Sequence, residues 1–284
     1  MKLAPFALAA LFFAAPALAA TPAAPVAADW RRPDPDNVLV VDSSKGRIIV
    51  ELAPWAAPAH VERIRLLTRQ GFYNGLSFFR VIDQFMAQTG DPRNDGTGGT
   101  EDLPDLKAEF MFRRGRDQAF TMVSRIAPDG EHAVTETGIV GSLPVRGPPD
   151  MQMMVSADGK APGWGLFCAG VLGMARGSPP DSANSQFFFM RQTYPSLDTN
   201  YTAFGRVISG LDAVRAIKVG EPVTPPRDVM TRVRLLSDIP AGERPDVQIL
   251  DTASPSFAEV LATARATKGP GLSPCDIDIP VKVG

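Results

Sequence analysis

The chain has 284 residues, 44% of them hydrophobic, and a net charge of −2. This length suits one elaborated domain or two small ones, and the apolar content is ordinary for a protein with a full hydrophobic core. The near-neutral charge lacks the basic excess that attracts nucleic acids, so we expect no nucleic-acid partner.

Residues 1–19 have the layout of a secretory signal peptide. One basic residue, Lys2, precedes an apolar stretch that is too short to span a membrane, and Ala17-Leu18-Ala19 is a cleavage site of the small-residue type. We therefore expect cleavage after Ala19, a periplasmic or secreted protein, and no membrane association once the signal is removed. Residues 20–36 are rich in Ala and Pro, and we expect a flexible leader there.

Short apolar runs separated by turn residues predict a mainly β protein with few helices. Residues 38–41 and 47–52 are β-branched runs on either side of Ser44-Lys45-Gly46, which predicts a hairpin. Pro58 suits the first turn of a helix that stops at Gly71. The other elements expected are a helix over 210–217 and strands over 78–83, 85–89, 119–124, 170–175, 186–191, 203–208 and 229–236.

Arg80 stands inside an otherwise apolar strand, between Phe78-Phe79 and Val81-Ile82. Residues two apart in a strand share a face, so Phe78 and Arg80 project together. A guanidinium beside aromatic rings is a poor core element unless a ligand or partner uses its donors. No acidic residue close in sequence offers itself as the partner of Arg80.

Two sequence runs, 72–99 and 182–207, contain FFRV, FMAQTGDP, GTGG, SQFFF and AFGRV in that order. Together they resemble the cyclophilins, the peptidyl-prolyl cis-trans isomerases, over residues 37–237. The resemblance implies a closed antiparallel eight-stranded barrel capped by two helices. Residues 111–167 are longer than the minimal family pattern, so we expect a long loop insertion there. The C-terminal extension, 238–284, is expected to pack on the barrel through a helix that starts near Ser254-Pro255.

The resemblance also implies the site residues. Arg80 matches the catalytic arginine, and Gln88 matches the amide that binds substrate backbone and helps to place this arginine. The residues that match substrate-binding positions are Phe85, Met86, Phe188 and Leu197 in the proline pocket, Tyr201 at its border, and Ala175, Arg176 and Gln186 along the groove. Without the motifs, the apolar members of this set would be interpreted as ordinary core.

Three positions depart from the family pattern. Arg176 replaces a more common Asn, and it could favour acidic residues beside the proline. Ser196 stands where drug-sensitive relatives carry Trp, so we expect weak cyclosporin binding. Thr89 replaces a frequent Gly and is expected to tighten the groove.

Two cysteines, Cys168 and Cys275, would meet an oxidising compartment after export. A disulfide between them would join the tail to the barrel, and the alternative is two unpaired buried thiols. The sequence leaves both open.

The resemblance implies a peptidyl-prolyl cis-trans isomerase that acts on proline-containing segments without a cofactor or metal. We expect a monomer, and the signal peptide makes exported proteins the expected substrates. The alternative is a non-enzymatic binding or chaperone module that uses the insertion. A hydrolase or a metal site has little support, because the chain has only two histidines. We expect His60 on the solvent side of the first helix and His132 in a loop.

Overall fold

The computed structural model describes residues 24–127 and 134–284. The predicted signal peptide and His132 lie outside these residues. None of the helices in the described ranges combines the length and apolar character that a membrane crossing requires.

Eight antiparallel strands form the main sheet, in the order β14-β2-β3-β13-β11-β12-β5-β4. The predicted hairpin is present, with Val38 opposite Glu51 and Ser43 opposite Gly46. The strands are β2 (Val38–Ser43), β3 (Gly46–Leu52), β4 (Arg80–Ile82), β5 (Met86–Thr89), β11 (Val171–Met174), β12 (Phe187–Met190), β13 (Ala203–Ser209) and β14 (Met230–Leu235).

This sheet is curled but open, so the expected closed barrel is wrong. The edge strands β4 and β14 do not pair with each other. An isolated bridge, Ser77 to Val229, and a few backbone hydrogen bonds, such as that from the Phe78 amide to the Asp228 carbonyl at 2.9 Å, join residues 75–78 to 228–230. Strand β4 has only three residues, and its outer edge bonds to a loop residue, Gly220, instead of to a strand. A loop that covers a short edge satisfies its backbone groups without closing the sheet.

Helix α1 (Pro58–Arg69) packs on the main sheet through the predicted apolar stripe of Val61, Ile64 and Leu67, all at most 1% exposed. His60 is fully buried, which corrects the expectation that it faces solvent. Its Nδ1 lies 2.6 Å from Glu109, whose carboxylate also accepts the first amides of the helix. Helix α2 (Leu211–Arg215) occupies part of the second predicted helix.

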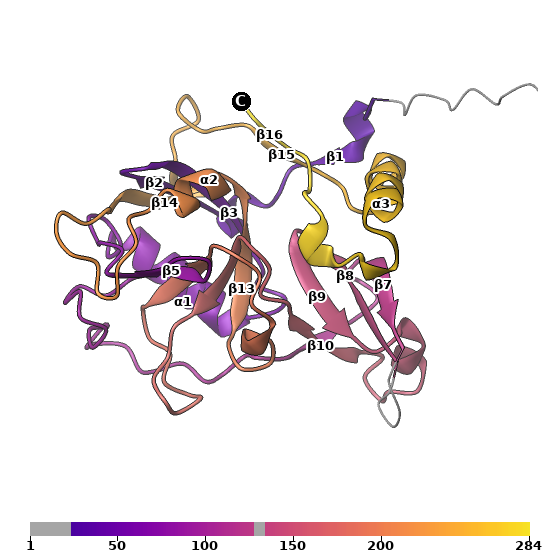
Figure 1. Ribbon diagram of the computed structural model, residues 1–284, viewed down its shortest axis with the longest axis horizontal. Coiled ribbons are helices and arrows are strands. Elements are labelled where there is room, and N and C mark those ends of the chain that lie inside the picture. Colours follow the sequence, from indigo (N-terminus) through magenta and orange to yellow (C-terminus); the bar gives the residue numbers. More distant parts are fainter. Residues whose placement is uncertain (1–23, 128–133) are drawn as a thin grey trace, which may run out of the picture.

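The insertion is a second sheet, not the long loop that we expected. Its five antiparallel strands run in the order β6-β10-β9-β8-β7 and lie beside the main sheet in Figure 1. Apolar residues of this sheet share a buried cluster with β11, β12 and β13, so the insertion packs directly behind part of the main sheet. The strands are β6 (Phe112–Arg114), β7 (Thr121–Ile126), β8 (Thr135–Val140), β9 (Leu143–Gly147) and β10 (Ala161–Gly165).

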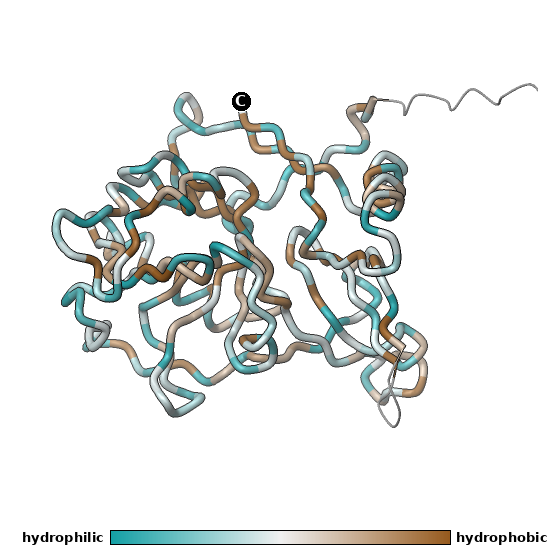
Figure 2. The backbone as a smooth tube through the Cα atoms, viewed as in Figure 1, coloured by the Kyte–Doolittle hydropathy of each residue, from teal (hydrophilic) through white to brown (hydrophobic). Residues whose placement is uncertain are grey.

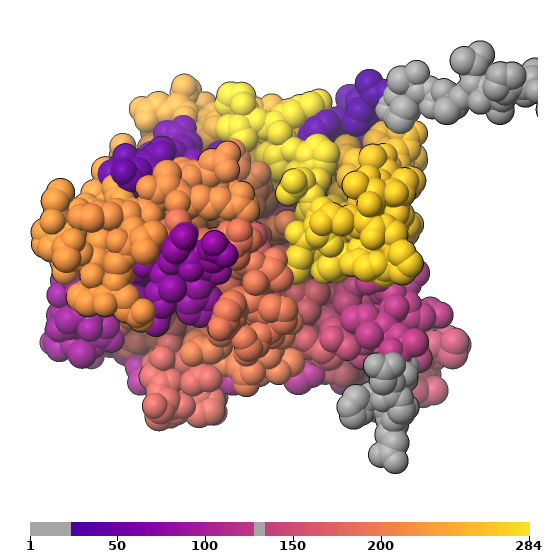
Figure 3. Space-filling model, in the orientation of Figure 1, coloured from indigo at the N-terminus to yellow at the C-terminus, as the bar shows by residue number. Residues whose placement is uncertain are grey.

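The C-terminal extension contacts both sheets. Strands β15 (Val247–Leu250) and β16 (Val281–Val283) share a buried cluster with β2 and β3, while α3 (Pro255–Lys268) shares another with β7 and β8. The Ser254 hydroxyl caps α3 by accepting the Phe257 amide, as the sequence suggested. In Figure 3 the yellow extension lies across both the main sheet and the insertion, and in Figure 2 apolar segments follow its strands.

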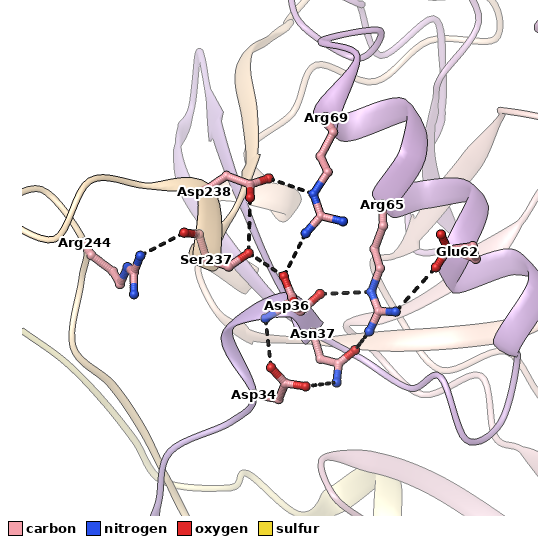
Figure 4. Close-up of polar contacts among 9 residues, drawn as sticks. All are labelled: Asp34, Asp36, Asn37, Glu62, Arg65, Arg69, Ser237, Asp238 and Arg244. Atoms are coloured by element: carbon pink, nitrogen blue, oxygen red, sulfur yellow. Dashed lines mark hydrogen bonds and ion pairs between the residues drawn. The ribbon is translucent and has the colours of Figure 1, made fainter.

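The described part of the expected flexible leader is folded. Strand β1 (Trp30–Arg31) pairs with β15 and so joins a three-stranded sheet with the tail. Asp36 accepts hydrogen bonds from Arg69 at 2.8 Å and from Ser237 at 2.6 Å, in the polar network of Figure 4. These contacts hold the segment against α1, which a composition rich in Ala and Pro does not reveal.

Cys168 and Cys275 form a disulfide with their Cα atoms 5.0 Å apart. The bond connects the residue before the β11 turn to the tail, across 107 residues of sequence. Both sulfur atoms belong to the apolar cluster between the main sheet and the insertion.

Candidate active site

A cavity of about 180 Å³ lies at one end of the main sheet, where residues on and beside strands β4, β5 and β12 line it. The structure brings together nine of the ten residues that the motifs predicted for the catalytic and substrate-binding site. They are Arg80, Phe85, Met86, Gln88, Ala175, Arg176, Phe188, Leu197 and Tyr201.

Strand register explains how these residues meet. Gln88 on β5 lies opposite both Arg80 on β4 and Phe188 on β12. Because neighbours along a strand face opposite sides, Phe187 and Phe189 point into the main core while Phe188 belongs to the cluster on the cavity side. Gly173 makes room for the Phe188 ring, because a Cβ there would lie 2.4 Å from it.

A chain of amides connects Arg80 to the neighbouring loop. Arg80 Nη1 donates to Gln88 Oε1 at 3.2 Å, and Gln88 Nε2 donates to Gln186 Oε1 at 2.9 Å. Gln186 Nε2 then donates to the carbonyls of Gly96 and Gly98, at 3.0 and 2.7 Å. Gln186 thus supports Gln88, although it does not line the cavity itself.

The acidic partner of Arg80 was not predicted from the sequence. Glu221 lies 141 residues further along the chain, and its Oε1 accepts a hydrogen bond from Arg80 Nε at 2.6 Å. The same oxygen lies 2.6 Å from Arg80 Nη2. Nothing local marks this pair, since only the fold brings the two residues together.

Aromatic rings build the rest of the cavity wall. Phe85 packs against Tyr194 with ring centroids 4.5 Å apart, a contact that the motifs did not predict. Tyr201 meets Phe188 edge-on, with ring centroids 5.9 Å apart. The Arg176 guanidinium lies 4.6 Å from the Tyr201 ring centroid and donates to the carbonyl of Asn200. Arg176 is therefore held against the wall by its own contacts.

A second cavity of about 400 Å³ adjoins the first and shares Gln88, Ala175 and Arg176 with it. Gln186 lines this cavity together with the glycine-rich residues 96–100. Asn184 anchors that loop by accepting the amide and hydroxyl of Thr100, both at 2.8 Å. The two cavities lie side by side along these shared residues, which leaves room for a peptide that extends beyond the first cavity.

Asp198 lies directly behind the cavity wall, next to Leu197. Burial raises the pKa of its carboxyl to about 6, although a hydrogen bond from the Phe167 amide and the charge of Arg146 both act to lower it. The Phe167 amide donates to Asp198 Oδ1 at 2.8 Å. This carboxyl supports the wall but does not line the cavity.

Within residues 24–127 and 134–284, no group of three or more His, Cys, Asp and Glu side chains could hold a metal ion. The cavity instead combines one guanidinium, several amides and a set of apolar rings. This combination can bind a small apolar group and direct hydrogen-bond donors at one polar atom beside it.

The family model described as "Cyclophilin type peptidyl-prolyl cis-trans isomerase/CLD" matches residues 38–237. A "Probable peptidyl-prolyl cis-trans isomerase" of Brucella suis is 35% identical over 198 residues, which cover 66% of this chain and 74% of the relative. The "Peptidyl-prolyl cis-trans isomerase-like 1" of Mus musculus is 29% identical over 208 residues, covering 73% and 94% of the two chains.

The crystal structure of cyclophilin AquaCyp293 from Hirschia baltica has a TM-score of 0.79 to this structure and 33% sequence identity. The match covers 89% of this chain and 93% of the other, so the shared fold extends beyond residues 38–237. The open β fold and the cavity thus define a protein of the cyclophilin class. The chain belongs to the cyclophilin-type peptidyl-prolyl cis-trans isomerase family. Its activity is the cis-trans isomerisation of peptidyl-prolyl bonds.

Proposed function

We propose that Arg80 catalyses rotation of X-Pro bonds by stabilising the twisted amide. The barrier to rotation, roughly 18–20 kcal/mol, arises from resonance between the amide nitrogen and its carbonyl. As the bond twists, the lone pair returns to the proline nitrogen and becomes a hydrogen-bond acceptor. A donor that binds this nitrogen better in the twisted form than in either planar form lowers the barrier.

The contents of the cavity support this proposal. Met86, Phe188 and Leu197 are each at most 8% exposed, and together with Phe85 they offer an apolar surface to a proline ring. Arg80 lies at the same cavity with its guanidinium tied to Gln88. Donors that are already in place lose little free energy to reorganisation when the amide twists.

The substrates that we propose are proline-containing segments of exported proteins, bound by a monomer in the periplasm or outside the cell. The proposed location rests on residues 1–19, which read as a signal peptide. Mass spectrometry of the mature N-terminus after expression of the full chain tests cleavage after Ala19. Light scattering in solution tests the monomer.

The observation that carries the mechanism is the position of Arg80 beside the apolar cavity. Replacing it by Ala should slow isomerisation of a short X-Pro peptide by about 100-fold, the loss typical of removing one preorganised donor. NMR exchange spectroscopy on the peptide measures the rate. Arg47→Ala is the matched control, because Arg47 is also a strand arginine paired with an acid, Asp42, but lies outside the cavity. Wild-type activity in Arg80→Ala would show that the mechanism is wrong.

A second role, the capture of client chains by the insertion, is favoured by its exposed apolar side chains. Met151, Met154 and Val155 are 71–84% exposed. Replacing the two methionines by Ser should weaken binding of an unfolded client while leaving peptide isomerisation unchanged. Equal client binding by the variant would argue against this role.

A further inference from the structure

Glu221 is the ion-pair partner of Arg80, and the mechanism described so far makes no use of it. Among the described residues, the ion pairs of Arg80 are with Glu221 alone. One carboxylate oxygen lies 2.6 Å from both Arg80 Nε and Arg80 Nη2. The carboxylate therefore contacts the edge of the guanidinium that Nε and Nη2 form.

Backbone hydrogen bonds on both sides of Glu221 place it beside Arg80. Gly220 and Val81 exchange two hydrogen bonds of 2.8 Å, and the Val223 amide donates to Phe79 at 2.8 Å. Phe79 and Val81 flank Arg80, just as Gly220 and Val223 flank the Glu221 segment. Val223 is 1% exposed and belongs to the main core, which anchors this segment firmly.

The contacts of Arg80 leave part of its guanidinium free. An arginine carries five N–H donors. Nε donates to Glu221, Nη2 lies 2.6 Å from the same carboxylate oxygen, and Nη1 donates to Gln88. The remaining donors of Nη1 and Nη2 are available to a bound peptide. Glu221 and Gln88 thus hold the group from two sides.

We propose that Glu221 is a positioning residue for catalysis, which holds the Arg80 guanidinium at the proline cavity before substrate binds. This inference rests on the proposed role of Arg80. An arginine side chain has many rotamers, and an arginine that is already ordered loses less freedom when the transition state forms. The negative charge of Glu221 is not itself required, since an amide oxygen accepts the same N–H groups.

Stability alone does not account for the pair. The Arg80 and Glu221 side chains are 37% and 53% exposed, and pairs this open to water contribute little to the free energy of unfolding. Removing Glu221 should therefore change catalysis more than folding. That difference separates a positioning role from a structural one.

The test compares Glu221→Ala with Glu221→Gln in the peptide exchange assay. We expect Ala to lower kcat by about 10-fold with KM changed less than about twofold, and Gln to retain activity within about twofold of wild type. In NMR spectra, the ¹⁵Nε–H signal of Arg80 should be retained in Glu221→Gln. It should be lost to exchange with water in Glu221→Ala. Asp158→Ala is the matched control, because it breaks a pair with Arg113 of similar exposure, 50% and 48%, in the insertion sheet.

The Arg80→Ala background separates this inference from the mechanism on which it rests. There, adding Glu221→Ala should have no further effect on the rate, because the group to be positioned is gone. An unchanged or faster rate in Glu221→Ala alone overturns the inference, and so does an equal loss in the Gln variant. If Arg80→Ala itself keeps the wild-type rate, the proposed mechanism fails, and the inference fails with it.

Discussion

Phe167 stacks on Phe188 with ring centroids 6.0 Å apart and an interplanar angle of 28°. Phe188 lines the proline cavity, whereas Phe167 immediately precedes Cys168 of the disulfide. The backbone amide of Phe167 also donates to Asp198, behind the same wall. The cavity is therefore supported from behind by residues that connect it to the tail and the insertion.

Removal of the disulfide should destabilise the protein. A bond that closes a loop of 107 residues restricts the unfolded chain strongly, and its loss should lower the free energy of unfolding by about 4 kcal/mol. Urea unfolding of a Cys168→Ser, Cys275→Ser double variant measures the change, and reduction of the wild type should reproduce it. An unfolding free energy equal to that of the oxidised wild type would contradict this prediction.

Phe188→Leu should weaken peptide binding selectively. The smaller side chain enlarges the cavity and removes ring contacts with the proline, so we expect KM to rise by about 10-fold, equivalent to about 1.4 kcal/mol. Phe189→Leu is the control, because that neighbouring ring faces the main core. Both variants should lose similar stability, about 1 kcal/mol. Equal KM values for the two variants would show that Phe188 does not contact substrate.

Gln88 and Gln186 should act as a coupled pair. Gln88 Nε2 donates to Gln186 Oε1 at 2.9 Å, and Gln88 in turn accepts from Arg80. Either residue changed to Ala should therefore disturb the placement of the guanidinium. A double-mutant cycle on kcat/KM should give a coupling energy of about 1 kcal/mol, the range for residues in one hydrogen-bond network. Additive effects of the two substitutions would rule out this coupling.

Asp198 should make stability depend on pH. Its pKa is about 6 in the folded protein, because of burial, and 3.8 in the reference state. Between these values the folded state holds a proton that the unfolded state has released. The free energy of unfolding should therefore fall as pH rises from about 4 to about 6. The full shift corresponds to about 3 kcal/mol, and screening by solvent at this partly exposed carboxyl reduces the expected change to about 2 kcal/mol.

Asp198→Asn tests this origin of the pH dependence. The amide oxygen can still accept the Phe167 N–H, but no charge has to be buried at neutral pH. Urea unfolding at pH 7.5 should find the variant more stable than the wild type by about 1–2 kcal/mol, with little difference at pH 4.5. A variant that is less stable at pH 7.5 would mean that the carboxylate itself stabilises the wall.

Local sequence signals were sufficient where a single segment determines the outcome. The hairpin of 38–52 followed from β-branched runs around Ser44-Lys45-Gly46, and the start of α3 followed from Ser254 and Pro255. The nine cavity residues were found through the resemblance of the motifs to a known family. Alternation along a strand would not have identified them. Phe188 illustrates this limit, since its side of the sheet depends on the register with Gln88.

Local signals failed where the outcome depends on distant partners. The insertion was interpreted as a Gly- and Pro-rich loop, yet β6 pairs with β10, 47 residues further along the chain at Arg114 and Ala161, and α3 from the tail packs on β7 and β8. His60 was expected on the solvent side of the first helix. It can be buried because Glu109, 49 residues away, accepts a hydrogen bond from its backbone amide and lies 2.6 Å from its ring Nδ1.

The sequence by itself determined the class of protein, the apolar character of the cavity and the identity of Arg80, because these depend on residue types at short spacings. Only the tertiary structure decided that the main sheet stays open, that the insertion is a sheet, and that Glu221 meets Arg80. The open sheet edge and the Glu221 pair rest on contacts between segments far apart in the chain, and so do the pairing of β6 with β10 in the insertion and its cover by α3. Such contacts depend on the three-dimensional path of the chain, which no short stretch of residues specifies.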